Sequence, residues 1–499
     1  MSDPIPTVPH FINGEVRMGE AARFAPVYNP ATGQQTHRVP LGADAVDAAV
    51  AAARAAYPAW RAASLARRTH ILFQIRERLV AHQEDLARII TAQHGKVLAD
   101  AMGEVARGLE NVEFACGIPQ LLKGEYSEQA STDVDVYSIR QPLGVVVGVS
   151  PFNFPAMVPL WMVANAIACG NTFVLKPSEK DPSASVRLAE LMTEAGLPPG
   201  VLNVVQGDRE AVEALVGHPD VAAVSVVGST PVARAIRRAA VAADKRVQAL
   251  GGAKNHLVVL ADADVAAAAD GAVSAAYGSA GERCMAVSVV VAVDDVADEL
   301  VAAITERMAR LAIGDGMDPA SDMGPLVTRE HRDRVAGYVA SAQRDGATVV
   351  VDGREAPVAS GPGFFLGTTL LDHVTPQMAC YRDEIFGPVL SVVRVSSLDE
   401  ALQLVNDNPW GNGMALYTRD GGAARRFQFE VLCGMVGVNV PIPVPVGYHS
   451  FGGWKASLFG DAHMYGPEGI NFYTRRKVVT SRWPSTTPAG VDLRFPGAQ

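Results

Sequence analysis

Two kinds of hydrophobic spacing alternate along the chain. Residues 44–56 and 64–93 are rich in alanine, with apolar side chains three and four positions apart, which predicts helices. From residue 133 the spacing changes, because DVDVYSIR alternates like an exposed strand. The apolar run in PLGVVVGVS, bounded by Pro142 and Ser150, is typical of a buried strand.

A regular order of strands and helices follows. Short β-branched runs alternate with helical patterns, in the order NTFVLKPS, SASVRLAELMTEAG, VLNVVQGD, EAVEALVGH and VAAVSVVGST. This βαβαβ series predicts a doubly wound parallel sheet, which binds ligands beyond the carboxyl ends of its strands.

A second α/β series begins near residue 255. The strand-like runs are HLVVLAD, SVVVAV, TVVVDG and VLSVVRV, and residues 264–280 and 296–312 have helical patterns. The tail segment NFYTRRKVVTSRW alternates like an edge strand, which favours pairing with another subunit. We therefore expect an α/β protein with two parallel-sheet domains and a small β arm.

Composition and charge narrow the class of protein. A chain of 499 residues is too long for a single hydrophobic core, so more than one domain is expected. Its net charge of -10 argues against a nucleic-acid partner. The five cysteines are widely spaced with no CxxC pair, which predicts free thiols in a reducing compartment and no metal site. The start has no signal-peptide pattern, and no apolar run is long enough to span a membrane, so we expect a cytoplasmic protein.

Cys284 is the first candidate for chemistry. It lies in GSAGERCMAVS, among small residues that leave an open approach and just before a strand pattern. A nucleophilic cysteine needs such access and a depressed thiol pKa. A lone cysteine is more often a small buried side chain, so the interpretation depends on companion motifs.

Four other segments supply such companions. Asn153, in SPFNFPAMVP, is an amide that can donate to an oxyanion, although a turn asparagine is the common alternative. Lys176 and Glu179 follow a strand, where a cofactor ribose binds, and the carboxylate would favour NAD over NADP. Gly228 and Ser229 precede the start of a predicted helix, where a phosphate can bind. Glu384 and Phe386 precede a predicted strand and could hold the nicotinamide end of the cofactor. Each of these could instead be an ordinary loop.

The ordered set PFNFP, KPSE, GST, GxRC and EIFGPV resembles the aldehyde dehydrogenase superfamily over nearly the whole chain. The resemblance implies that Cys284 is the nucleophile and Asn153 the oxyanion amide. It also implies that the remaining motif residues hold the cofactor NAD: Phe152, Lys176, Glu179, Gly228, Ser229, Glu384 and Phe386. The implied domains are 1–122 with 142–254 for NAD, 255–465 for catalysis, and 123–141 with 466–499 for bridging and assembly, usually as a tetramer.

One departure from that family is informative. Hydrolytic members have the sequence E-L-G-G-K where this chain has Leu250-Gly251-Gly252-Ala253-Lys254. Ala249 or Leu250 therefore replaces the glutamate that acts as the general base in those members. Water is a poor nucleophile without a base, whereas a thiol ionises near neutrality. We expect release of the acyl group to coenzyme A, although Glu282 or another carboxylate could serve as a base in a hydrolytic alternative.

The strings GAKNH, ERCMA and VNVPIPVPVGYHSFGGWKASLFGD resemble a CoA-acylating subgroup that oxidises and decarboxylates methylmalonate and malonate semialdehydes. The resemblance implies that Arg107 and Arg283 hold the substrate carboxylate, for which a guanidinium is well suited. A solvated helix charge is the alternative for Arg107, and a structural role is the alternative for Arg283.

Overall fold

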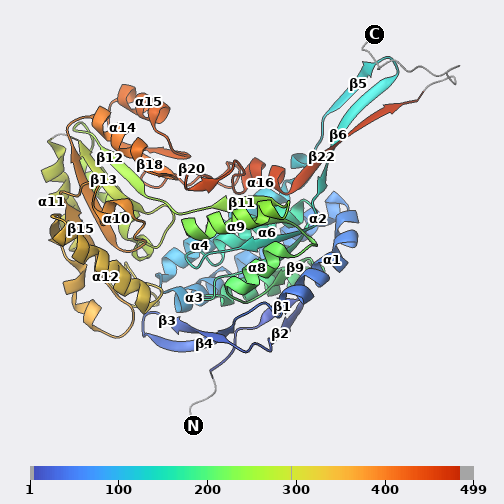
Figure 1. The fold of residues 1–499 in the computed structure, drawn as a ribbon, viewed down its shortest axis with the longest axis horizontal. Coiled ribbons are helices and arrows are strands. Elements are labelled where there is room, and N and C mark those ends of the chain that lie inside the picture. The colour runs from blue at the N-terminus through green and yellow to red at the C-terminus, as the bar shows by residue number, and fades with distance from the viewer. Residues whose placement is uncertain (1–4, 294, 484–499) are drawn as a thin grey trace.

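The computed structural model describes residues 5–293 and 295–483. Its first sheet has eight strands in the order β2-β1-β9-β8-β7-β10-β11-β21 (Figure 1). The strands β7 to β11 pair in parallel, as the βαβαβ pattern predicts, while β1, β2 and β21 add antiparallel edges. Their bounds are β1 His10–Ile12, β2 Glu15–Arg17, β7 Val145–Val149, β8 Thr172–Lys176, β9 Leu202–Val204, β10 Val221–Val227, β11 Arg246–Leu250 and β21 Leu458–Phe459.

The second sheet has seven strands in the order β14-β15-β16-β13-β12-β18-β19. All neighbours pair in parallel except β14 with β15. The bounds are β12 Asn255–Val259, β13 Val287–Val293, β14 Thr348–Val351, β15 Thr369–Asp372, β16 Val389–Val395, β18 Gly413–Tyr417 and β19 Met435–Val438. The α/β class with parallel-sheet domains is therefore confirmed. The strand β21 lies within residues 255–465, the range expected for the catalytic domain, but it pairs with β11 of the first sheet.

Helices flank both sheets (Figure 1). Around the first sheet lie α1 Val46–Ala62, α2 Leu65–Ala81, α3 Gln83–His94, α4 Leu98–Cys116, α5 Ile118–Leu121, α6 Met157–Ala168, α7 Ser183–Glu194, α8 Arg209–Gly217, α9 Thr230–Ala242 and α16 Gly466–Phe472. Around the second lie α10 Val265–Tyr277, α11 Val296–Met308, α12 Arg329–Arg344, α13 Ala379–Arg382, α14 Leu398–Asp407 and α15 Gly421–Glu430. No helix of the described residues is both long enough and apolar enough to cross a bilayer.

Two helices differ from the sequence pattern. The continuous spacing over 64–93 is interrupted at His82, whose backbone (φ -115°, ψ 20°) leaves the helical region and separates α2 from α3. The helix α6 shows no amphipathic spacing because all of its residues are buried. A helix that is apolar all round gives no periodic signal to read.

A three-stranded sheet forms an arm that projects from the body (Figure 1). It contains β5 Tyr126–Ser131, β6 Val134–Pro142 and β22 Thr474–Arg482, in the order β22-β6-β5. The tail strand thus lies at an edge, as its alternation predicts. The last part of the expected assembly segment, residues 484–499, lies outside the described residues.

Candidate active site

Cys284 lies on a tightly packed loop between α10 and β13. The loop opens with a short 3-10 turn, Gly278–Gly281, in which Ser279 and Ala280 have positive φ (56° and 51°). Non-glycine residues in this region carry strain that is concentrated at functional sites. A side chain at Gly281 would collide with the carbonyl oxygen of Gly387, so the loop needs glycine there.

Two asparagines outside the loop fix its far end. The side-chain amides of Asn255 and Asn412 donate to the carbonyl oxygen of Cys284 at 2.9 and 3.1 Å. Asn255 begins β12 and Asn412 precedes β18, so the second sheet positions the cysteine. Neither asparagine stood out in the sequence, because their distance from Cys284 along the chain gives no local signal.

The half-buried Cys284 borders a cavity of about 320 Å³. The two arginines expected to bind a carboxylate, Arg107 and Arg283, both line it. Aromatic side chains close the other walls, namely Phe154, Trp161 and Phe451. The cavity therefore combines a thiol, two cations and apolar surface.

Both arginines already have carboxylate partners. Arg107, on α4, donates to both oxygens of Glu110 at 3.0 and 2.9 Å, and to the carbonyl oxygens of Val444 and Pro445. Arg283 pairs with Asp100, also on α4. A substrate carboxylate would compete with these side chains for the guanidinium groups.

The thiol pKa differs from the expectation. We expected a depressed pKa, but burial raises the pKa of Cys284 to about 12, and the carboxylate of Glu384 adds to this. The positive charge of Arg283 opposes the shift without overcoming it. The thiol is therefore protonated at neutral pH, and the sulfur can act as a nucleophile only after losing this proton.

Asn153 is held by a buried ion pair that the sequence did not reveal. Lys96 lies 2.7 Å from Glu104 and donates to the carbonyl oxygen of Asn153 at 2.6 Å. The other oxygen of Glu104 accepts from the backbone N–H groups of Ala156 and Met157, at the start of α6. The pair thus fixes the segment between β7 and α6. Asn153 itself is buried, and its neighbour Phe154 lines the cysteine cavity.

The expected ribose and phosphate residues meet at one edge of the first sheet. Lys176 ends β8, Gly228 follows β10, and β7 lies between these two strands. Lys176 pairs with Glu179 at 3.2 Å, and although burial opposes ionisation, this charge keeps the pKa of Glu179 below its ordinary value. Glu179 is therefore an anion.

This edge has room for a phosphate. A side-chain carbon at Gly228 would meet nothing closer than 3.6 Å, so a ligand can approach the backbone. Ser229 precedes α9 without a side-chain cap, which leaves the first N–H groups of the helix available. The residues present fit a dinucleotide.

Glu384 and Phe386 lie between this edge and the cysteine. Glu384 accepts from the backbone N–H of Ala253 at 2.8 Å, and burial raises its pKa. Phe386 has φ 59°, and its ring meets that of Phe152 edge-on at 5.8 Å. Glu384, Phe386 and Cys284 line one small cavity.

Neither Glu282 nor the two residues that replace the family's glutamate line the cavities around Cys284. Ala249 and Leu250 are buried in β11. Glu282 is fully buried, with the Nε2 atoms of His94 and His331 at 3.7 and 3.4 Å. Among the described residues, the carboxylates that line the cavities around Cys284 are Asp100, Glu104 and Glu384.

A parallel α/β fold with this cysteine loop defines the class of protein. The model of the aldehyde dehydrogenase family matches residues 17–479, and the chain belongs to that family. It is 56% identical to the malonate-semialdehyde dehydrogenase of Pseudomonas aeruginosa, over 96% of this chain and 97% of that one. It is 50% identical to malonate-semialdehyde dehydrogenase 3 of Geobacillus kaustophilus, over 96% and 99%.

Two solved structures of similar proteins superpose on nearly the whole chain. A Sinorhizobium meliloti protein described as a methylmalonate-semialdehyde dehydrogenase, in complex with NAD, superposes with a TM-score of 0.96 at 50% identity, covering 97% of this chain and 99% of that one. The methylmalonate-semialdehyde dehydrogenase of Oceanimonas doudoroffii has a TM-score of 0.95 at 53% identity, covering 96% and 99%.

Proposed function

We propose that the protein oxidises methylmalonate semialdehyde and malonate semialdehyde with NAD and coenzyme A. The products are propionyl-CoA or acetyl-CoA, carbon dioxide and NADH. The observation that carries the proposal is the cavity in which Arg107 and Arg283 lie beside Cys284. The names of the relatives support the substrate class and the use of NAD.

In this mechanism the sulfur of Cys284 bonds to the aldehyde carbon, after the thiol has lost its proton. The side-chain amide of Asn153 and the backbone N–H of Cys284 donate to the resulting oxyanion. NAD, when bound, accepts the hydride, which leaves a thioester on Cys284.

The arginines act on the other end of the substrate. Arg107 and Arg283 orient the carboxylate by charge-assisted hydrogen bonds. The bond between the carboxylate and the α-carbon then breaks, because the thioester carbonyl accepts the electron pair as an enolate, and carbon dioxide leaves. The α-carbon of the enolate takes up a proton from water, which leaves a propionyl or acetyl thioester on Cys284. Asp100 and Glu110 are the anions that neutralise the guanidinium groups before and after this step.

The remaining site residues bind the parts of the cofactor. Lys176 and Glu179 bind the adenosine ribose, Gly228 and Ser229 the phosphates, and Glu384, Phe386 and Phe152 the nicotinamide side. Residues 1–122 with 142–254 form the NAD-binding domain and 255–465 the catalytic domain. Residues 123–141 and 466–499 join subunits in a homotetramer, which we place in the cytoplasm because all five cysteines are free.

The experiment is a measurement of NADH formation from methylmalonate semialdehyde, with and without coenzyme A, with the products identified by mass spectrometry. We expect sustained turnover only with coenzyme A, giving propionyl-CoA. Sustained turnover to a free acid without coenzyme A would contradict the proposal and indicate a hydrolytic enzyme.

Cys284→Ala tests the nucleophile. Without the sulfur no thioester can form, so we expect NADH formation to fall to background, with the fold retained by circular dichroism. Cys433→Ala, at a buried cysteine outside the cavity, is the matched control and should retain activity. Substantial turnover by Cys284→Ala would refute the assignment.

A further inference from the structure

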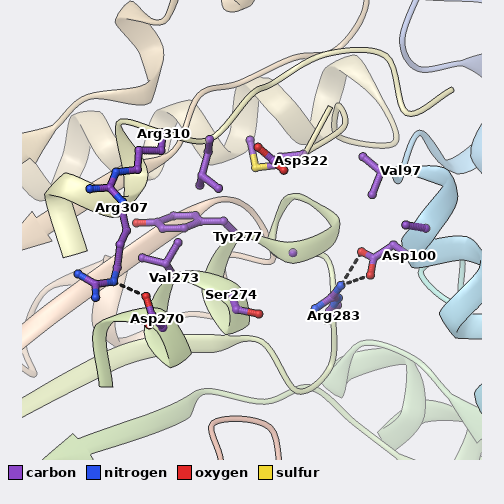
Figure 2. A pocket seen from close by; sticks show the side chains of 14 residues that line it. Val97, Asp100, Asp270, Val273, Ser274, Tyr277, Arg283, Arg307, Arg310 and Asp322 are labelled. Carbon is purple, nitrogen blue, oxygen red and sulfur yellow. Dashed lines mark hydrogen bonds and ion pairs between the residues drawn. The ribbon is translucent and has the colours of Figure 1, made fainter. Parts of the chain in front are cut away.

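The cavity of about 480 Å³ shown in Figure 2 lies behind the cysteine loop. It runs between α10, the end of α11 and the residues that begin α4. Arg307 and Arg310 lie at one end, and Arg283 with Asp100 lies at the other (Figure 2). None of the roles proposed above uses the middle or the far end of this cavity.

Its inner end adjoins the reactive thiol. Asp100 and Arg283 line both this cavity and the one that contains Cys284. The guanidinium of Arg283 rests on Gly278, where any side chain would collide with it. The ion pair between Arg283 and Asp100 is thus a shared wall between the two cavities.

Charged side chains lie at both ends of this cavity, and Asp322 lies between the two ends (Figure 2). Val273, Tyr277, Leu311 and Met323 line it as apolar or mixed surface, and the exposed Ser274 lies beside them (Figure 2). Val273 and Tyr277 lie between Arg283 at one end and Arg307 with Arg310 at the other, and an elongated, uncharged part of a ligand fits their surface (Figure 2).

The outer end presents two cations. Arg307 is half-buried and pairs with Asp270, which fixes its position. Arg310 is exposed over 72% of its side chain and has an i,i+4 partner in Glu306. Exposed pairs of this kind are weak, so the guanidinium of Arg310 is free to bind a phosphate.

We propose that this cavity binds coenzyme A as the thiol co-substrate. The phosphates lie at Arg307 and Arg310, the pantetheine arm lies along Val273, Tyr277 and Leu311, and the thiol reaches Cys284 past Arg283. The inference rests on the proposed CoA-acylating function and adds the place where the thiol binds.

The thiol step exchanges the thioester on Cys284 for a thioester on coenzyme A. The sulfur of coenzyme A bonds to the acyl carbon while the bond from that carbon to the Cys284 sulfur breaks. Cys284 leaves as a thiolate and takes up the proton that the coenzyme A thiol gives up. Because the cavity is separate from the strand edge at Lys176 and Gly228, NADH and coenzyme A do not compete for one site.

The first test is Arg310→Ala, compared with Arg209→Ala. Arg209 is an exposed arginine on α8 with the same i,i+4 pairing, to Glu213, outside the cavity. The burst of NADH without any thiol reports the acylation step, and turnover with coenzyme A or with pantetheine reports the thiol step. We expect Arg310→Ala to raise the KM for coenzyme A about fivefold, as loss of one screened phosphate contact implies. Pantetheine lacks the nucleotide phosphates, so its KM should not change.

The second test fills the cavity with Ser274→Trp. We expect the KM for both thiols to rise at least tenfold with the NADH burst retained. Ala267→Trp, exposed two turns earlier on α10 and outside the cavity, should behave as wild type. NADH should inhibit noncompetitively with respect to coenzyme A.

Wild-type KM values for coenzyme A in both Arg310→Ala and Ser274→Trp would overturn the proposed site, as would competitive inhibition by NADH. If the wild-type protein instead turns over steadily without any thiol, the CoA-acylating function fails, which is a different result.

Discussion

At the scale of single residues, the site brings together side chains that are far apart in the sequence. Arg107 and Cys284 line one cavity although α4 and the cysteine loop belong to different parts of the chain. Motifs predicted Cys284 and Glu384 as site residues, but the raised pKa of the thiol comes from burial and from the charge of Glu384 nearby, and both depend on the folded arrangement.

Arg107→Leu tests the carboxylate role. Loss of the guanidinium removes charge-assisted hydrogen bonds, so kcat/KM for methylmalonate semialdehyde should fall on the order of 100-fold. The same variant should lose only a few-fold on propanal, which has no carboxylate. Equal losses on both aldehydes would mean that Arg107 is structural.

Glu282→Gln tests the buried carboxyl between His94 and His331. Lys180, Lys96 and Arg334 also face it and lower its pKa, but burial prevails and raises the pKa to about 8. A raised carboxyl pKa adds stability below the ordinary value of 4.5, and this stability is lost as the pH rises through about 8.

Glutamine cannot ionise, so the difference in Tm between Glu282→Gln and wild type should become more positive from pH 5 to pH 9. Calorimetry at several pH values measures this. Glu299→Gln, at an exposed position on α11, is the control and should show no such trend. A difference that does not change with pH would show that Glu282 is not protonated in the folded protein.

At the scale of elements, the helix α6 and the segment before it depend on one buried ion pair. Glu104 of α4 accepts from the N–H groups that begin α6, and Lys96 bonds to the backbone of Asn153. Three segments of the chain therefore share one pair of charges, and the oxyanion candidate is fixed by all three.

Lys96→Met leaves the carboxylate of Glu104 buried without its partner. Breaking such a pair costs about 3–5 kcal/mol, so Tm should fall by several degrees and NADH formation should weaken with it. Urea unfolding measures the loss, and Lys96→Met with Glu104→Gln should recover part of it. A single variant as stable as wild type would show that the pair contributes little.

At the scale of the whole molecule, the arm projects away from the two domains, and within residues 5–293 and 295–483 the outer edge of β22 pairs with no other strand. Val478 on β22 is 65% exposed, and Ile139 on the neighbouring β6 is also exposed. An exposed apolar edge favours pairing with a second copy of the chain.

Val478→Asp tests this assembly. A carboxylate at this edge should weaken subunit pairing, so sedimentation should show smaller species than the wild-type protein forms. Val16→Asp, at an exposed valine on the edge strand β2, is the control and should leave the assembly unchanged. An unchanged sedimentation profile for Val478→Asp would place the subunit contact elsewhere.

The sequence by itself determined the α/β class and the succession of strands and helices along the chain, and it predicted Cys284 as the nucleophile, because β-branched runs, helical spacing and an ordered set of motifs are local signals. It also shows Ala249 and Leu250 where hydrolytic members of the family have a glutamate. The tertiary structure alone decided the break at His82, the existence of α6, the pair of Lys96 with Glu104, and the cavity that ends at Arg283. The physical reason is that burial, ion pairing and cavities depend on contacts between distant segments, and these leave no periodic pattern along the chain.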